Sequence, residues 1–180
     1  ATKPLPAPPG TWITEVPVSN DPNQGTRYRD FTNWWYNLML NQGTNMQEKM
    51  VLFLHNHYTS QRSKVSYPQH MYKQQDLFRK NVFGNLRQLT KDVTIDPAML
   101  IYLDGRQNNK NVPNENYGRE LMELFTLGRG NYTETDVKEA ARAFTGWGFS
   151  LGGDFTNRPF FHDTGNKTIF GKTGNLDRKS

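Results

Sequence analysis

Apolar residues recur at the helical period in several short stretches, and this spacing restricts the chain to a mainly helical fold. In the first stretch, Phe31, Trp34, Trp35, Leu38 and Met39 follow the i, i+3, i+4, i+7, i+8 pattern of an amphipathic helix. Comparable patterns follow in 45–61, 68–93, 115–128 and 133–146, and the stretch 96–105 predicts a further short helix. The sequence therefore predicts an irregular core of four to six helices joined by long loops.

Residues with strong local preferences mark where these helices begin and end. Asp96 followed by Pro97 is typical of a helix start, because Asp caps the first turn and Pro suits its first position. Thr133 is a second predicted N-cap, with acids in the turn that follows. We expect Gly84 to interrupt the helix over 68–93 and Gly128 to end the helix that begins near residue 115.

The stretch 45–61 is the expected central helix. Thr44 or Asn45 can cap it, and its middle, "MVLFL", is apolar on all sides, which predicts burial on most of them. His57 follows Met50 and Phe53 along one stripe, so we expect it to lie in line with core residues.

The two ends of the chain differ from its middle. Residues 1–27 are rich in Pro, Gly and Asn, which predicts an extended linker before a helical domain over 28–180. The segment "FFHDTGNKTIFG" predicts a small β-hairpin near the C-terminus, turning around Gly165 and Asn166. The abrupt start and finish of the sequence suggest a fragment of a longer protein, so the rest of the same polypeptide is an expected partner.

Charge and composition exclude several functions. The net charge is +5, but no run of Lys and Arg exceeds two residues, which argues against a nucleic-acid partner. No stretch reaches the ~20 apolar residues that a transmembrane helix needs. There is no Cys, which excludes disulfides, thiolate metal sites and Cys nucleophiles, and fits an exported protein as well as a cytosolic one. The sequence also lacks the GxSxG, Walker, GxGxxG and HExxH motifs.

The segment "NENYGRELMELFTLG" places acids among apolar residues. On an α-helix, Leu121, Leu124 and Phe125 share one face, while Glu120 and Glu123 lie side by side on another. Two ionised carboxylates at this spacing repel, so Arg119, a shared proton or a cation must offset them. Either this face is solvated or its acids turn inward to form a site.

Arg119 cannot face Glu120, because adjacent helix residues point about 100° apart. We expect Arg119 to pair with an acid on another segment, with Asp104 or Asp136 as the predicted partner.

His57 is the histidine most suited to complete a site with Glu120 and Glu123. Helical bundles build metal sites from inward His and Glu side chains, and two carboxylates with one imidazole suit Zn²⁺ or Mn²⁺. A divalent metal is therefore one candidate cofactor, with these three residues as ligands and catalytic groups. The alternative is a core histidine that hydrogen-bonds to a neighbour.

Two loops offer further polar residues. Asp104, Asn108 and Glu115 match positions 1, 5 and 12 of a calcium loop, but Asn109 stands where that loop requires Gly, so an EF-hand is not indicated. Such Asn-rich turns usually satisfy their own backbone. Elsewhere, His162 and Asp163 form a pair suited to acid–base work or metal binding, although surface His–Asp pairs are common.

Three segments together resemble one bacterial family. They are "FLHNHYTSQRSKV", the long stretch from "DPAMLIYLDG" to "AFTGWGF", and "HDTGNKTIFG". The chain resembles, from about residue 44 to 172, the family catalogued as domain of unknown function 1800. The family pattern falls on His57, Asp104, Asn108, Asn114, Glu115, Asn116, Arg119, Glu120, Glu123, Thr133, Glu134, Asp136, Trp147, His162, Asp163 and Lys167.

The resemblance implies a setting more than an activity. Members of the family are often predicted to be exported, which implies a periplasmic, outer-membrane-associated or extracellular location and a partner in the envelope. This chain departs from the pattern at Gly118, where Ala is expected, and at Leu54, where an aromatic residue is usual.

Two functions fit these observations. One is a metal-dependent or acid–base hydrolase that acts on an envelope or extracellular polymer, with Asp104, Asn108, Glu115, Asn116, Arg119, His162 and Asp163 as binding residues. The other is a non-catalytic structural or interaction module, in which the same residues form a buried polar network. Convergence on an open cleft would favour the enzyme, and dry, paired groups would favour the module.

Overall fold

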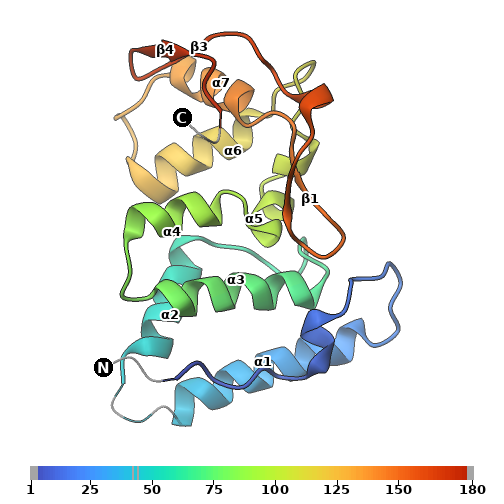
Figure 1. Ribbon diagram of the computed structural model, residues 1–180. Helices are drawn as coiled ribbons and strands as arrows, with labels where there is room; N and C mark the ends of the chain where they lie inside the picture. Colours follow the sequence, from blue (N-terminus) through green and yellow to red (C-terminus); the bar gives the residue numbers. More distant parts are fainter. Residues whose placement is uncertain (1–3, 42, 44, 178–180) are drawn as a thin grey trace. The chain divides into compact units, whose positions relative to one another are not determined.

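The computed structural model describes residues 4–41, 43 and 45–177, and in this part of the chain it is mainly helical (Figure 1). The chain forms two compact units. The first contains the residues up to Met99 together with Leu151–Asp154, and the second contains Leu100–Ser150 and the residues from Phe155 onward. The mainly α fold class is confirmed, and the described residues form seven α-helices rather than four to six.

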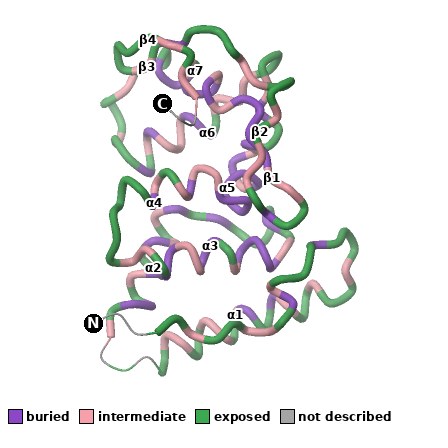
Figure 2. The backbone as a smooth tube through the Cα atoms, in the orientation of Figure 1, coloured by how far each residue is buried: buried purple, intermediate pink, exposed green. Residues whose placement is uncertain are grey.

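The first unit consists of helices. They are the 3₁₀ turn η1 (Thr11–Thr14), α1 (Gln24–Asn41), α2 (Gln47–His57), α3 (Pro68–Asn81), α4 (Leu86–Val93) and the start of α5 (Pro97–Tyr102). Helix α3 packs against α1, α2 and α4 and carries more buried residues than α1, as Figure 2 shows. Helix α1 begins at Gln24, inside the stretch 1–27 that we expected to be a linker.

The ends of these helices follow the local signals. Helices α3 and α4 are separate on either side of Gly84, and this division adds the extra helix. The Asp96 carboxylate accepts a hydrogen bond from the Met99 amide at 3.0 Å, as an N-cap should. Helix α2 departs from the expectation, because its N-cap is Met46, which makes no side-chain capping hydrogen bond. Asn45 lies one residue earlier, where its Oδ1 accepts from the Gln47 amide at 2.6 Å, and Thr44 lies outside the described residues.

The buried face of α2 is not the expected one. Val51 and Leu54 are buried, but Phe53 is 59% exposed and Met46 is also exposed, so the stripe that leads to His57 does not face the core. The buried face instead includes Glu48. An acid can lie there because Arg79, on α3, neutralises it.

The second unit combines short helices with two hairpins. After the 3₁₀ turn η2 (Gly105–Gln107) come α6 (Glu115–Glu120), a π-helical segment η3 (Leu121–Thr126), α7 (Glu134–Ala143) and the 3₁₀ turn η4 (Pro159–Phe161). Strand β1 (Trp147–Phe149) pairs with β2 (Phe155–Asn157), and β3 (Lys167–Ile169) pairs with β4 (Lys172–Gly174), both antiparallel. Helix α7 packs against α6 and β3 around Met122, Val137 and Ala140.

The hairpin near the C-terminus is confirmed, but its turn lies at Phe170 and Gly171, both of which have positive φ. Gly165 was the expected turn residue, and its amide instead donates a hydrogen bond to Asp163 at 2.8 Å. The hairpin of β1 and β2 had no counterpart in the prediction.

The helix that begins at Glu115 changes type after Glu120. Over Leu121–Thr126 the backbone is π-helical, and the Leu127 amide donates to the Met122 carbonyl at 2.8 Å. The wider turn alters the angle between successive side chains. Met122 and Phe125 are therefore buried while Leu124 is 57% exposed, which corrects the apolar face expected from an α-helical period.

Gly118 explains the close packing of α6 on α7. A Cβ atom at this position would lie 3.1 Å from the carbonyl oxygen of Val137 and 3.4 Å from the Cβ of Ala140. The glycine found in place of the expected Ala therefore lets the two helices approach more closely.

No helix among the described residues is both long enough and apolar enough to cross a membrane.

Candidate functional site

Nine of the ten candidate residues lie in the second unit, and His57 lies in the first. Within the second unit, six of them contribute to three sets of polar residues. These are an amide cluster (Asn108, Asn114 and Asn116), a set of glutamate–arginine pairs on and near α6, and a cluster around Arg142 that contains Glu139, Asp163 and Lys167.

The amide cluster holds the loop before α6. Asn108 has no exposed surface, and its Nδ2 donates to the Ala141 carbonyl at 2.8 Å while its Oδ1 accepts from the Asn114 amide at 2.8 Å. Asn114 caps α6 by accepting from the Asn116 amide at 3.0 Å. The side chain of Asn108 thus joins the end of α7 to the start of α6.

Asp104 contributes through its backbone. It has a left-handed conformation (φ 57°) at the start of η2, and its carbonyl oxygen accepts from Asn114 Nδ2 at 3.2 Å. Asn116 Nδ2 reaches the neighbouring Leu103 carbonyl at 3.4 Å. This loop satisfies its own backbone, as Asn-rich turns usually do.

Arg119 makes a two-point contact with an acid on another helix. Its Nη1 and Nη2 each lie 2.7 Å from a carboxylate oxygen of Glu134, at the start of α7. The predicted pairing with another segment is confirmed, but the partner is neither Asp104 nor Asp136. The hydrogen bonds from Arg119 lower the pKa of Glu134, and the same contacts raise the pKa of Arg119. Glu115 lies 3.5 Å from Arg119 on the other side.

Asp136 is committed to the cap of α7. Its Oδ2 accepts from the Thr133 hydroxyl at 2.6 Å and from the Thr133 amide at 2.9 Å, which completes a capping box. Its Oδ1 accepts from the Phe170 amide at 2.7 Å. Both carboxylate oxygens of Asp136 are thus engaged at the start of α7 and with the turn after β3, and neither binds Arg119.

Glu123 and Glu120 differ in their surroundings. Glu123 accepts from the Tyr132 hydroxyl at 2.7 Å and from Arg129 Nε at 2.5 Å. Both hydrogen bonds lower the pKa of Glu123, and the one from Tyr132 has the larger effect. Glu120 is half-buried, and its carboxylate has no hydrogen-bond or ion-pair partner among the described residues. The two neighbouring acids therefore do not share one partner.

His162 and Asp163 contact different groups. His162 Nδ1 donates to the Thr145 carbonyl at 2.8 Å. Asp163 accepts from Arg142 Nε at 2.8 Å, and this hydrogen bond is the main cause of its lowered pKa. The two side chains are thus fixed separately, and neither directs its contact at the other.

Arg142 is the centre of the third cluster. Besides Asp163, its Nη1 donates to both carboxylate oxygens of Glu139 at 2.9 Å and to the Asn166 carbonyl at 3.2 Å. Lys167 has no exposed surface, and its ammonium donates to the Asp163 carbonyl and to Asn175 Oδ1. Burial lowers the pKa of Lys167. These contacts attach the segment 163–175 to α7.

His57 is the last residue of α2. Its ring stacks on Phe53 with 6.4 Å between centroids and meets Tyr58 edge-on at 4.6 Å. His57 belongs to the first unit, and Glu120 and Glu123 to the second, so their expected meeting stays a prediction. The described residues contain no group of three or more His, Asp or Glu side chains arranged to hold a metal ion.

Two buried polar contacts in the first unit had no sequence signal. Arg79 donates from Nε and Nη2 to the two carboxylate oxygens of Glu48, at 2.6 and 2.7 Å. The partners are 31 residues apart, and neither belongs to a recognisable motif. The one hint in the sequence is that Glu48 stands in a helix whose middle is apolar, where an acid needs a partner if it is buried.

The second buried contact is centred on Asp96. Gln74 Nε2 donates to Asp96 Oδ2 at 3.0 Å, while Gln74 Oε1 accepts from the Ser60 hydroxyl at 2.5 Å. Burial raises the pKa of Asp96 to about 7, although the hydrogen bonds from Met99 and Gln74 oppose the rise. The sequence identified Asp96 as a cap but not as a buried acid.

The fold and these clusters define a mainly helical protein in which polar side chains hold loops and helix ends together. The model of the family described as "Protein of unknown function (DUF1800)" matches residues 10–179, so the chain belongs to this family. No curated protein and no solved structure matches the chain.

Proposed function

We propose that this chain is a non-catalytic structural module whose polar motif residues fix the packing of helices and loops. The observation that carries the proposal is that three of the motif acids bind an arginine within their own unit. Glu134 binds Arg119, Glu123 binds Arg129 and Tyr132, and Asp163 binds Arg142.

The chemistry of these contacts favours a structural role. Two-point arginine–carboxylate contacts restrict both position and angle. Asn108 uses both of its polar side-chain atoms on backbone groups, and its complete burial leaves no surface for a substrate. Paired contacts of this kind can specify one packing arrangement without reacting chemically.

A metal-dependent or acid–base hydrolase acting on an envelope or extracellular polymer is the second candidate. It is favoured by Glu120, the half-buried acid that has no partner among the described residues. For Glu123 to join it as a ligand, a metal would have to replace the contacts with Arg129 and Tyr132. Glu120 and Glu123 could therefore bind one metal ion only if Glu123 first released Arg129 and Tyr132.

Elemental analysis combined with thermal unfolding separates the two functions. For the structural module we expect no bound transition metal and a melting temperature that a chelator does not change. Glu120→Gln should behave like Glu115→Gln, a matched substitution on the same helix. A stoichiometric metal, with a chelator response that Glu120→Gln or His57→Gln abolishes and Glu115→Gln preserves, would establish the metal site instead.

We also propose an exported location, in the periplasm, at the outer membrane or outside the cell, with a partner in the envelope. The absence of Cys is compatible with it, since the fold needs no control of thiol oxidation. Fractionation of cells that produce the full-length protein tests this proposal, and recovery in the cytoplasm alone would contradict it.

A further inference from the structure

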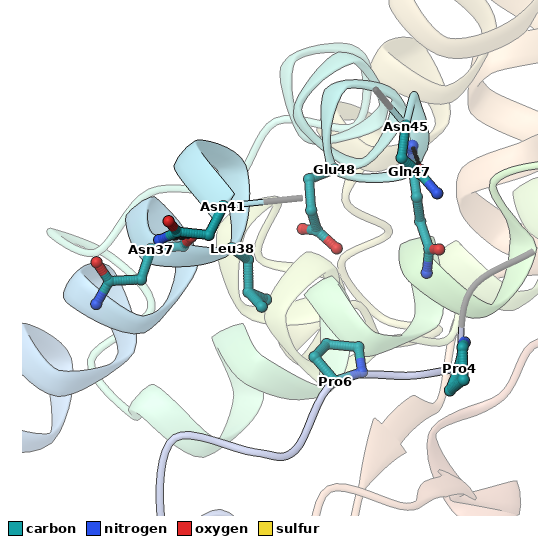
Figure 3. Close-up of a pocket in the computed structure, with 8 residues that line it drawn as sticks. All are labelled: Pro4, Pro6, Asn37, Leu38, Asn41, Asn45, Gln47 and Glu48. Carbon is teal, nitrogen blue, oxygen red and sulfur yellow. Dashed lines mark hydrogen bonds between the residues drawn. The ribbon is translucent and has the colours of Figure 1, made fainter. Parts of the chain in front are cut away.

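A pocket of about 210 Å³ lies in the first unit, between the N-terminal segment, the end of α1 and the start of α2 (Figure 3). Its lining consists of Pro4, Pro6, Asn37, Leu38, Asn41, Asn45, Gln47 and Glu48. Four of the eight residues carry carboxamides, and three are apolar. None of them belongs to the polar clusters of the second unit.

The charges of the described lining are balanced. Among the described residues of the lining, Glu48 is the one that carries a charge, and Arg79 binds both of its carboxylate oxygens from α3. The two residues are only 4% and 3% exposed. A charged ligand would have to lose its hydration here without meeting an unpaired opposite charge, which is costly. The pocket therefore favours a neutral ligand.

The carboxamides leave hydrogen-bonding groups available. Gln47 is 6% exposed, its side-chain amide has no partner among the described residues, and Figure 3 shows it extending toward Pro4. As part of the lining, this carboxamide is placed to exchange hydrogen bonds with a ligand in the pocket. Asn37 likewise makes no side-chain hydrogen bond within the described residues.

The remaining two carboxamides are partly used. Asn41 Nδ2 donates to the Asn37 carbonyl at 2.9 Å, which leaves Asn41 Oδ1 as an acceptor. Asn45 Oδ1 accepts from the Gln47 amide, which leaves Asn45 Nδ2 as a donor. The lining thus offers both donors and acceptors, the combination that hydroxyl groups require.

We propose that this pocket binds one neutral pyranose unit of a carbohydrate. The carboxamides would exchange hydrogen bonds with the sugar hydroxyls, and Leu38, Pro4 and Pro6 would pack against its C–H groups. The volume is below the ~300 Å³ at which pockets for larger small molecules begin, so it suits a single ring. This binding activity goes beyond the structural role proposed above.

Titration of the ¹⁵N-labelled chain with neutral methyl pyranosides tests the proposal, with the glucoside, galactoside, mannoside and N-acetylglucosaminide as probes. We expect at least one of them to cause saturable shifts of the amides in 37–48, with Kd in the millimolar range. Methyl glucuronide, which adds a carboxylate to the same ring, should bind more weakly than the glucoside.

Two variants locate the site. Gln47→Ala should weaken binding about tenfold and Asn37→Ala by a smaller factor, as expected for losing one or two hydrogen bonds. Asn33→Ala is the matched control, because Asn33 is exposed on the same helix and does not line the pocket. Asn37 is also exposed, so its variant should fold even if Gln47→Ala does not.

Three results would overturn the proposal. They are the absence of saturable shifts with every neutral probe, equal or tighter binding of the glucuronide, and binding that Asn33→Ala weakens as much as Asn37→Ala.

Discussion

The two units bury their polar groups in different ways. In the first unit, Glu48 and Arg79 connect one helix side chain to another, and both are sealed between α2 and α3. In the second unit, Asn108 and Lys167 connect a side chain to the backbone of irregular segments: Asn108 accepts from the Asn114 amide, and Lys167 donates to the Asp163 carbonyl. The first arrangement fixes how helices pack, and the second fixes where irregular segments lie.

The two arrangements differ in why the loss of a partner lowers the stability of the fold. A sealed ion pair matters chiefly because removing one partner leaves a buried charge. A side chain that binds loop backbone replaces hydrogen bonds that a helix or sheet would otherwise supply. Loss of a partner should therefore be most costly in the first unit.

Removal of Arg79 should have the largest effect. Arg79→Met leaves Glu48 charged and buried, so we expect the free energy of unfolding in urea to fall by about 3–5 kcal/mol. The double variant Glu48→Gln with Arg79→Met should lose clearly less, because no charge remains. Equal losses for the single and double variants would contradict the account of a buried ion pair.

Asp96 should make stability depend on pH. Its pKa is about 7 in the folded chain and near 3.8 in an unfolded one, so the folded state is penalised progressively as the pH rises from about 4 to 7. Asp96→Asn should therefore raise the free energy of unfolding at pH 8 by about 1–3 kcal/mol, after allowance for an altered cap. Chemical denaturation at pH 8 and pH 4 measures this, and an equal gain at both values would show that ionisation is not the cause.

Arg142 tests the contacts of the second unit. Arg142→Ala removes its hydrogen bonds to Asp163, Glu139 and Asn166, and should lower the free energy of unfolding by about 1–2 kcal/mol. The low pKa of Asp163 means that its contribution is present above pH 4 and is lost as the pH falls further. Arg129→Ala, at an arginine whose side chain is 87% exposed, is the control, and a loss as great as that of Arg142→Ala would contradict the expected difference between exposed and half-buried arginines.

Arg119→Lys should have the smallest effect. Lys cannot make the two-point contact with Glu134, but the side chains of this pair are 34% and 67% exposed, so water replaces much of what is lost. We expect the melting temperature to fall slightly, and less than for Arg142→Ala in parallel thermal scans. A fall as large as that of Arg142→Ala would mean that the pair is more strongly coupled to packing than its exposure indicates.

The sequence predicted features that depend on neighbouring residues. Thr133 and Asp136 are three residues apart and form their capping box without help from the rest of the fold. The start at Asp96 and Pro97 and the interruption at Gly84 are local in the same sense. These signals correctly placed the starts of α5 and α7 and the break between α3 and α4.

Features that depend on distant contacts escaped prediction. The acid Glu48 could be assigned to the buried face of α2 only once its partner on α3 was known. The π-helical segment 121–126 has no local sequence signature, and it altered which residues of the motif are buried. Arg119 was expected to find an acid elsewhere, but the choice of Glu134 depends on how α6 lies on α7.

The buried ammonium of Lys167 has a consequence for chemical labelling. Amine-reactive reagents attack a nitrogen that is both uncharged and exposed. Burial lowers the pKa of Lys167, which favours the uncharged amine, but the same burial keeps reagents away from it. It should stay unmodified while β3 remains against α7 and react quickly once that contact opens. The rate at which Lys167 is acylated therefore reports how often the contact between β3 and α7 opens.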